Sequence, residues 1–306
     1  IKYDRQMLAI IAPGQGSQTP GMLLPWISDP ANLELLSSWS DAIELDLHHL
    51  GTNADADEIR DTANAQPLIV AAGLLSARAL GAQGKFSYVA GHSVGEITAA
   101  AIAGVFTEID ALRLVRVRGQ EMAKAAAAAP SGMAAVLGGD RDVVLKAIAD
   151  AGLVAANDNG GGQIVAAGDL SALESLAPEG ARVRPLQVAG AFHTHFMAPA
   201  VEAFNNFASS IVAADPAVGV LSNKDGAVLT SGSEIKARII SQVANPVRWD
   251  LCMSTLESKG VTGALEVAPA GTLVGLLKRA VASIETCALK SPEDLASAQQ
   301  FVSSKG

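Results

Sequence analysis

The sequence predicts an α/β fold with a mostly parallel sheet, into which a smaller unit is inserted. Short aliphatic runs, such as Leu8 to Ala12 and Phe86 to Ala90, end in glycine-containing turns. Segments with helical spacing follow these runs, which is typical of parallel strands connected by helices. Near Pro130-Ser131-Gly132 the long helical segments give way to short strands in close succession, and this change marks the insertion.

The first part of the chain alternates strands and helices. Leu8 to Ala12 is interpreted as a buried strand, and Phe86 to Ala90 as a second strand that leads directly into another glycine-rich turn. Four segments have apolar residues at helical spacing: Asn32 to Leu47, Gln66 to Leu80, Glu96 to Val105 and Glu108 to Ala127.

The inserted unit has an order of elements of its own. We predict a strand, a helix, two strands, a helix and a strand at Met133 to Leu137, Asp140 to Ala151, Leu153 to Asn157, Gln163 to Ala166, Leu170 to Leu176 and Ala181 to Val188. This βαββαβ order is the ferredoxin-like unit. The sequence therefore predicts a small ferredoxin-like subdomain at residues 131–188, between the two parts of a large domain at residues 7–130 and 189–306.

The α/β pattern resumes after the insertion. We predict a helix after Met197 and strands at Val218 to Ser222 and Gly263 to Val267, with a last strand and helix within Thr286 to Val302. The first six residues, Ile1 to Gln6, lack a starting methionine and precede Met7. We expect them to be a remnant outside the fold.

Charge and composition argue against several classes of protein. The formal net charge is −9, whereas a general nucleic-acid binder presents a basic face, so we expect no nucleic-acid partner. The two cysteines, Cys252 and Cys287, have no metal-type spacing, and a reducing compartment suits them. No uncharged apolar run reaches about 18 residues, and no signal peptide is recognisable. We expect a cytoplasmic protein without membrane contact.

One pentapeptide has the pattern of an activated nucleophile. Gly91-His92-Ser93-Val94-Gly95 fits G-x-S-x-G between a predicted strand and a predicted helix, which is the context that this motif requires. A sharp turn there needs small residues two positions before and after the serine. It would present the Ser93 hydroxyl at a helix N-terminus, where N–H groups favour a developing oxyanion. The pattern is typical of the nucleophile elbow of an α/β-hydrolase-like domain.

A serine nucleophile needs a base, and the chain has five histidines. His92 should point away around the turn, while His48 and His49 lie in a polar helical stretch and are interpreted as surface residues. His193 and His195 remain, in a segment of low charge just after the insertion, and the residues alone do not decide between them.

A catalytic triad would also need a carboxylate that orients the histidine. Asp150, Asp158 and Asp169 are the candidates, but none has a convincing setting in the sequence. A dyad is the alternative, in which a carbonyl group orients the imidazole ring.

Five motifs follow one another along the chain: Pro13-Gly14-Gln15-Gly16-Ser17-Gln18, Gly91-His92-Ser93-Val94-Gly95-Glu96, Arg118-Gly119, Gly190-Ala191-Phe192-His193 and Asn245-Pro246-Val247-Arg248-Trp249. In this order they resemble the motifs of malonyl-CoA:acyl carrier protein transacylases, over nearly the whole chain from Met7. The acyltransferase domains of modular polyketide synthases share the pattern, but the length resembles that of the discrete enzyme.

The resemblance implies a Ser–His dyad. Ser93 would be the acylated nucleophile, and His193, rather than His195, would be its base. The backbone carbonyl of Gln242 would orient the histidine. The backbone N–H groups of Gln15 and Val94 would form the oxyanion hole.

The resemblance also implies substrate contacts. Arg118 would bind the free carboxylate of the malonyl group, which a planar guanidinium can hold with two parallel hydrogen bonds. Phe192 would fill the space where the methyl group of methylmalonyl would project. Asn157 and Asn159 would border the substrate channel. One departure from the family is Ala268-Pro269-Ala270-Gly271, where many relatives have G-P-G.

The activity implied is transfer of malonyl from malonyl-CoA to acyl carrier protein, through a malonyl-serine intermediate and without a metal or other cofactor. The partners would be malonyl-CoA and an acyl carrier protein of fatty acid or polyketide synthesis, and we expect a monomer. The alternative is a serine esterase or thioesterase of α/β-hydrolase type, which would share G-x-S-x-G but has no use for Arg118.

Overall fold

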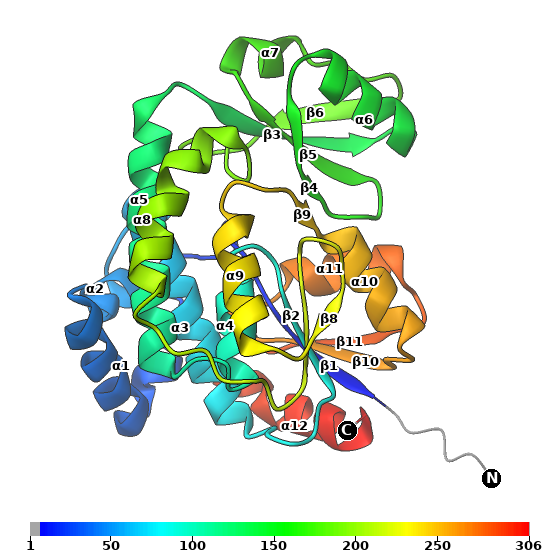
Figure 1. Ribbon diagram of the computed structural model, residues 1–306. Helices are drawn as coiled ribbons and strands as arrows, with labels where there is room; N and C mark the ends of the chain where they lie inside the picture. Colours follow the sequence, from blue (N-terminus) through cyan, green and yellow to red (C-terminus); the bar gives the residue numbers. More distant parts are fainter. Residues whose placement is uncertain (1–6, 306) are drawn as a thin grey trace.

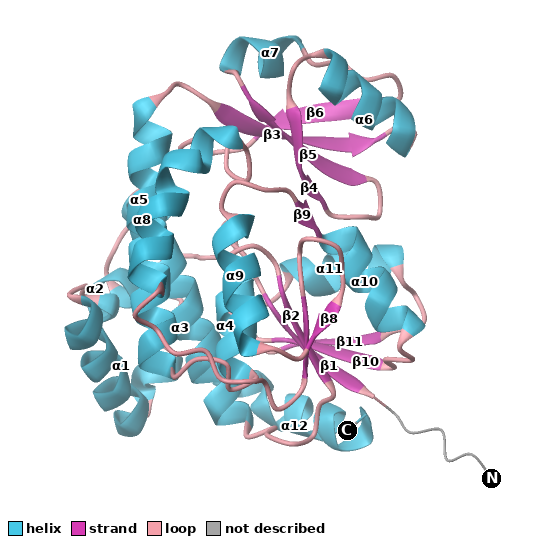
Figure 2. Cartoon of the chain, viewed as in Figure 1, coloured by secondary structure: helices cyan, strands magenta, loops and turns pink. Residues whose placement is uncertain are grey.

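The computed structural model describes residues 7–305, which form two β-sheets with helices packed around them (Figure 1). The predicted remnant at residues 1–6 lies outside the described residues. The chain has a mixed α/β fold, and Figure 2 shows the smaller sheet above the larger one. None of the helices within residues 7–305 combines the length and the apolar composition that a membrane crossing requires.

The larger sheet has six strands, and its neighbouring strands are parallel except for the last pair, which is antiparallel. At its centre Ile10 lies opposite Leu265 on one side and Val89 on the other. In spatial order the strands are β11 (Glu285–Ala288), β10 (Gly263–Glu266), β1 (Leu8–Ala12), β2 (Tyr88–Gly91), β7 (Gly219–Leu221) and β8 (Val228–Leu229).

Helices cover both faces of this sheet because successive side chains of a strand point to opposite sides. Leu8 and Ile10 on β1 belong to the larger core cluster, and Ala9 and Ile11 to a second one. The larger cluster contains α1 (Pro30–Ile43), α2 (Leu47–Thr52), α3 (Thr62–Leu80), α4 (Gly95–Ile102), α5 (Glu108–Ala128), α8 (Ala198–Ala208), α9 (Gly232–Gln242) and α12 (Leu295–Lys305). The second contains α10 (Trp249–Ser258) and α11 (Thr272–Ala280).

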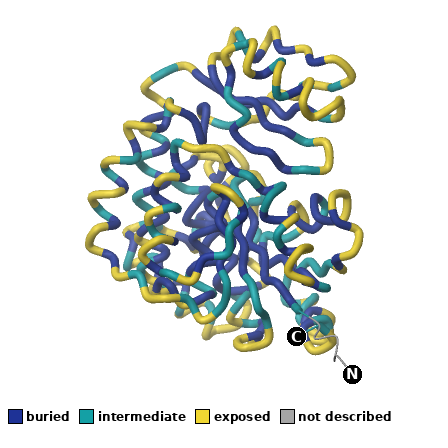
Figure 3. The backbone as a smooth tube through the Cα atoms, turned by 45° about the vertical axis from the view of Figure 1, so that its right-hand side comes forward, coloured by how far each residue is buried: buried dark blue, intermediate teal, exposed yellow. Residues whose placement is uncertain are grey.

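The smaller sheet has five strands and its own core, which includes residues of α6 (Arg141–Asp150) and α7 (Leu170–Ser175). Its strands, in spatial order, are β6 (Ala181–Pro185), β3 (Gly132–Gly138), β5 (Gln163–Gly168), β4 (Val154–Asp158) and β9 (Val247–Arg248). The pairs among the first four strands are antiparallel, whereas the last pair, β4 with β9, is parallel. The central strands of both sheets are largely buried (Figure 3), whereas the edge strands β6 and β11 are partly exposed.

Most predicted elements are present within a few residues of their expected bounds, but three expectations need correction. The predicted helix from Asn32 to Leu47 is two helices, because Glu44 adopts a left-handed φ of 51° that ends α1, and Asp46 caps α2. The last strand of the insertion ends at Pro185 rather than at Val188. The smaller sheet is not built by residues 131–188 alone, since β9 joins it from much later in the chain.

Several elements were not predicted from the sequence. These are α2, α9, α10 and α11, the short strands β8 and β9, and the 3-10 turns η1 (Trp26–Ser28), η2 (Glu58–Arg60), η3 (His195–Met197) and η4 (Pro292–Asp294).

Candidate active site

A cavity of about 210 Å³ lies between the two sheets, beyond the carboxyl ends of β1 and β2. Ligands of α/β sheets bind at this end of the strands, because the loops that follow them converge there. Two turns that follow strands of the larger sheet line the cavity: the turn after β1, which includes Gln15, and the turn after β2, which includes Ser93. The smaller sheet contributes Asn157 from β4 and Val165 from β5.

The turn between β2 and α4 has the tight geometry that the G-x-S-x-G pattern predicts. Ser93 has a left-handed φ of 53°, and its N–H donates to Asn223 Oδ1 at 2.8 Å. A Cβ on Gly91 would lie 1.9 Å from the carbonyl carbon of Gly95, and a Cβ on Gly95 would lie 2.2 Å from the carbonyl oxygen of Ala12. Only glycine fits at these two positions, so the main chain can turn sharply and present the serine side chain to the cavity.

His193 contacts the serine hydroxyl directly. Its Nε2 lies 2.7 Å from Ser93 Oγ, and its Nδ1 lies 2.8 Å from the main-chain carbonyl oxygen of Gln242. A carbonyl oxygen can only accept, so Nδ1 carries the proton and the Nε2 lone pair of the neutral ring faces the hydroxyl. This is the arrangement of a nucleophile with its base and with a group that orients the base.

The surroundings keep this imidazole neutral. Burial removes the charged form from water and is the main reason why the pKa of His193 is lowered to about 3; the positive charge of Arg118 acts in the same direction. The ring is therefore available to accept a proton from Ser93 throughout the neutral pH range.

Arg118 on α5 lies 1% exposed beside the serine. Its Nη2 donates to Ser93 Oγ at 3.3 Å and to Gln242 Oε1 at 2.9 Å, and its Nη1 donates to Gln66 Oε1 at 2.6 Å. Burial lowers its pKa to about 10, and Glu96 opposes that shift, so the group remains cationic at neutral pH. Its Nε has no acceptor within residues 7–305. The site thus holds a buried positive charge next to the hydroxyl.

Comparisons with known proteins agree with this geometry. Residues 10–299 match the acyl transferase domain family. The malonyl CoA-acyl carrier protein transacylase of Mycobacterium tuberculosis is 53% identical over 296 residues, covering 94% of this chain and 98% of that protein. The chain belongs to this acyl transferase family. The transacylase of the same name from Escherichia coli is 34% identical, over 96% of this chain and 99% of that protein.

Solved structures of the family have the same fold. The MCAT structure from Mycobacterium tuberculosis has a TM-score of 0.93 at 52% identity, covering 96% of this chain and 99% of that one. A malonyl-transacylase in complex with its type II PKS acyl-carrier protein has a TM-score of 0.88 at 30% identity, covering 96% of this chain and 99% of that one.

Most of the other predicted residues of this acyl transferase line the same cavity, and Val94 directly follows Ser93. The N–H groups of Gln15 and Val94 have no hydrogen-bond acceptor within residues 7–305, so both can donate to an incoming oxygen. Phe192 and Asn157 are buried and line the cavity. Asn159 lines it too, and its Oδ1 lies 2.8 Å from His92 Nε2.

The remaining histidines lie apart from the serine–histidine pair. His195 and His48 are exposed, and His49 contacts Glu58 at 3.1 Å. His92 is turned toward Asn159 rather than toward the serine, but it also lines the cavity, so its side chain is not directed out of the site.

The carboxylates considered for a triad are also elsewhere. Asp150 pairs with Lys146, Asp158 pairs with Arg141, and Asp169 caps α7. The orienting group of His193 is therefore a main-chain carbonyl.

Three site residues were not singled out from the sequence. Glu96 and Asn223 are buried beneath the turn at Ser93, and Gln66 contacts Arg118 from α3. Asn223 has a signal that could have been found, because it is a polar residue just after a buried strand at the same sheet edge. Gln66 could have been noticed as a polar residue within an apolar helix.

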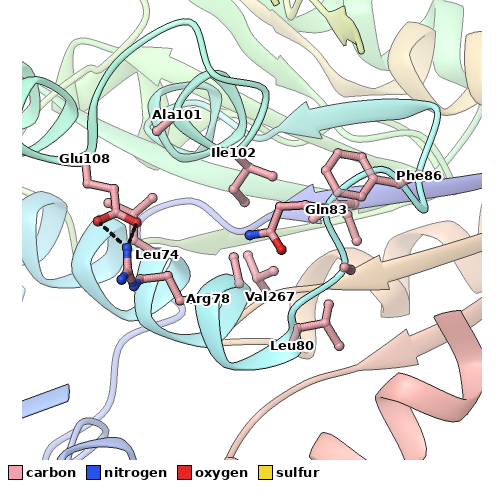
Figure 4. Close-up of a pocket in the computed structure, with 12 residues that line it drawn as sticks. Leu74, Arg78, Leu80, Gln83, Phe86, Ala101, Ile102, Glu108 and Val267 are labelled. Atoms are coloured by element: carbon pink, nitrogen blue, oxygen red, sulfur yellow. Dashed lines mark hydrogen bonds and ion pairs between the residues drawn. The ribbon is translucent and has the colours of Figure 1, made fainter. Parts of the chain in front are cut away.

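A second cavity, of about 100 Å³, lies away from this site. Figure 4 shows its apolar wall, which includes Leu74, Ile102 and Val267, and the Arg78–Glu108 ion pair beside it. It contains none of the residues predicted for chemistry.

Proposed function

We propose that this protein transfers the malonyl group of malonyl-CoA to the phosphopantetheine thiol of acyl carrier protein. The observation that carries the proposal is a buried arginine within 3.3 Å of a serine hydroxyl that is itself 2.7 Å from a neutral histidine. An ordinary esterase has no use for a buried cation beside its nucleophile. A malonyl group brings a carboxylate that such a cation can bind.

In the first half-reaction Ser93 Oγ attacks the thioester carbonyl while its proton moves to His193 Nε2. The tetrahedral oxyanion accepts hydrogen bonds from the N–H groups of Gln15 and Val94. The carbon–sulfur bond then breaks, and His193 returns the proton to the leaving sulfur. The products are free coenzyme A and a malonyl ester on Ser93.

In the second half-reaction the thiol of the carrier protein gives its proton to His193, and its sulfur attacks the ester carbonyl. The same N–H groups stabilise the second oxyanion. The carbon–oxygen bond to Ser93 breaks, and His193 returns the proton to Ser93 Oγ. The main-chain carbonyl of Gln242 accepts a hydrogen bond from His193 Nδ1 and so keeps the imidazole ring in the orientation that both proton transfers need.

Two groups would set the choice of acyl chain. Arg118 would hold the malonyl carboxylate, and the Phe192 ring would occupy the space beside the acyl group where a methyl branch would project. Asn157 would border the channel through which the thioester enters. A methyl group in an apolar pocket is worth only about 1–3 kcal/mol, so Phe192 is a modest filter compared with the arginine.

We further propose that residues 7–130 and 189–306 form an α/β-hydrolase-like catalytic domain, and that residues 131–188 form a ferredoxin-like subdomain. The antiparallel order β6-β3-β5-β4 supports the second assignment. The protein would act as a cytoplasmic monomer without a cofactor and would contact neither nucleic acid nor membrane.

The direct test is intact-protein mass spectrometry. Malonyl-CoA alone should add one malonyl mass to the native protein, and subsequent carrier protein should remove it. Ser93→Ala should remain unlabelled, because removing a nucleophile typically costs on the order of 10³- to 10⁶-fold in turnover. Free malonate as the main product would instead identify a hydrolase, and labelling of Ser93→Ala would exclude the proposed nucleophile.

A further inference from the structure

The side-chain amide of Gln242 lies between a buried carboxyl group and Arg118. Its Nε2 donates to Glu96 Oε2, to Asn223 Oδ1 at 3.0 Å and to the main-chain oxygen of Ser93 at 3.1 Å. Its Oε1 accepts from Arg118 Nη2 at 2.9 Å. Glu96 is 4% exposed and Gln242 is 5% exposed, so solvent does not substitute for these contacts.

These contacts fix which way the amide points. All three neighbours of Nε2 are oxygens that accept, whereas the neighbour of Oε1 is a guanidinium that can only donate. Reversing the amide would place its oxygen against three acceptors and its NH₂ group against Arg118. Glu96 is the one ionisable group among the three acceptors. Burial raises the pKa of its carboxyl group to about 8, so above that pH Glu96 is a carboxylate and supplies the strongest of these preferences.

The orientation of Gln242 in turn fixes the guanidinium. Each terminal nitrogen of Arg118 carries two N–H groups. Gln66 takes one N–H of Nη1, and Gln242 takes one N–H of Nη2. One N–H remains on each nitrogen, and that of Nη2 is directed at Ser93 Oγ. A carboxylate on the acyl group of Ser93 can accept from the Nη2 N–H that faces the hydroxyl, and the guanidinium keeps a second uncommitted N–H on Nη1.

We propose that Glu96 is a positioning residue which orients the Gln242 amide and thereby presents Arg118 to the carboxylate of the acyl group. The inference rests on the proposed function, and it assigns a role in acyl selection to a residue that contacts neither the substrate nor Arg118.

The decisive substitution is Glu96→Gln, which keeps the shape but gives the side chain a donating nitrogen. Glu96 Oε1 accepts the main-chain N–H of Asn223 at 2.6 Å, and that N–H cannot rotate away. The new amide would therefore turn its nitrogen toward Gln242, whose side chain can rotate. Gln242 would then present its NH₂ group to Arg118, and the guanidinium would lose its fixed orientation.

We expect Glu96→Gln to lower the ratio of kcat/KM for malonyl-CoA to that for acetyl-CoA, measured at about pH 9, where Glu96 is ionised in the folded native protein. The fall should be about 10- to 100-fold, the range expected when one hydrogen bond to a charged group is lost. Acetyl transfer should change much less, because acetyl has no carboxylate to align. Glu96→Asp keeps the acceptor but is shorter, so it should restore part of the ratio.

Glu266→Gln is the matched control. Glu266 is also a buried carboxyl group, but it accepts from the main-chain N–H groups of Gly271, Leu273 and Val274 and has no contact with Gln242. Its substitution should leave the malonyl-to-acetyl ratio unchanged, whatever it does to stability.

A double-substitution cycle separates positioning from general support of the fold. Gln242→Ala keeps the carbonyl that orients His193 but removes the amide, so it should lower the ratio by a similar factor. Combining it with Glu96→Gln should give no further fall, because both act through the same contact. If Glu96→Gln does not fold, as judged by thermal melting, the same cycle is run with Glu96→Asp.

Three results would overturn the inference: an unchanged ratio, equal losses with both substrates, or losses that multiply in the double variant. Each is distinct from failure of the proposed function, in which the native protein itself would transfer no malonyl group to carrier protein.

Discussion

Ser93 and His193, the residues that we propose to react, share an unusual backbone conformation. Within residues 7–305, three non-glycine residues have a left-handed φ, and two of them are Ser93 at 53° and His193 at 62°. Such conformations are costly and persist only where the surroundings hold them. Here Asn223 binds the N–H of Ser93, and Gln242 binds the ring of His193. The pair is therefore held in contact before any substrate arrives.

Substituting the two candidate histidines should distinguish their roles. His193→Ala should reduce malonyl transfer by on the order of 10³-fold or more, because Ser93 loses the group that accepts its proton. His195→Ala should have a small effect, since that ring is exposed and stacks on Phe196 at 4.5 Å between ring centroids. The measurement is the single-turnover rate of acyl-enzyme formation. A larger loss in His195→Ala would show that His193 is not the base.

Arg118→Ala should change which acyl group is transferred. Truncating one partner of a buried charge pair costs about 2–5 kcal/mol, so kcat/KM for malonyl-CoA should fall roughly 30- to 4,000-fold. Acetyl transfer should fall much less, because it makes no such pair. Arg118→Lys should recover only part of the activity, since an ammonium group lacks two parallel donors. Equal losses for both substrates would contradict the carboxylate-binding role.

At the scale of elements, the site depends on how closely the turn after β2 approaches the turn after β1. Gly95 begins α4 directly against the main chain of Ala12 and Pro13. That approach brings Ser93 and Gln15 to the same cavity although they are far apart in sequence. A side chain at this position would separate the two turns.

We therefore expect Gly95→Ala to destabilise the protein and to suppress acyl-enzyme formation, because its Cβ would lie 2.2 Å from the Ala12 carbonyl oxygen. Gly275→Ala is the control. It lies within α11, and its Cβ would come no closer than 3.8 Å to another side chain. There alanine should raise stability by about 0.5–1 kcal/mol through helix propensity. Urea unfolding of both variants tests this, and a stable, active Gly95→Ala would contradict it.

The sequence predicts some elements better than others for physical reasons. β1 and β2 are recognisable because each is a short apolar run that leads into a glycine-containing turn. β9 has two residues and no pattern of its own; its place is set by pairing with β4, far away in sequence. The same limit applies to the site. Ser93 follows from a local motif, whereas the roles of Glu96 and Gln242 depend on a contact between residues 146 positions apart.

At the scale of the whole molecule, the two sheets meet around the site. β9 pairs with β4, with Val247 opposite Asn157. His92, next to Ser93 in the chain, contacts Asn159, which follows β4 of the smaller sheet, at 2.8 Å. The cavity is lined by both parts, so relative movement of the sheets would alter access to Ser93. Glu96 is a buried ionisable group beneath the turn at Ser93, so the free energy of unfolding of the whole fold depends on pH.

Stability should decrease as pH rises from about 7 to 8 and should level off above about 8, where Glu96 loses its proton in the folded protein as well. Burial is the main cause that raises its pKa from 4.5 to about 8, against the opposing effects of the Asn223 N–H, Arg118, Gln242 and Arg238. In this window the folded state binds a proton that the unfolded state has already released. The free energy of unfolding therefore falls with pH, by at most about 1.4 kcal/mol per pH unit for one group.

Two histidines and a cysteine do not obscure this window. Burial lowers the pKa of His92 and of His193, so their contribution to stability changes below their unfolded value of 6.5. Burial raises the pKa of Cys252 above 9.0, so its contribution changes at higher pH. Urea unfolding in half-unit steps from about pH 7 to 8.5 measures the slope. Glu266 is the other carboxyl group whose pKa burial raises, so Glu96→Gln and Glu266→Gln are measured side by side. Glu96→Gln should reduce the slope between about pH 7 and 8 by more than Glu266→Gln does, and a native slope in Glu96→Gln would show that another group is responsible.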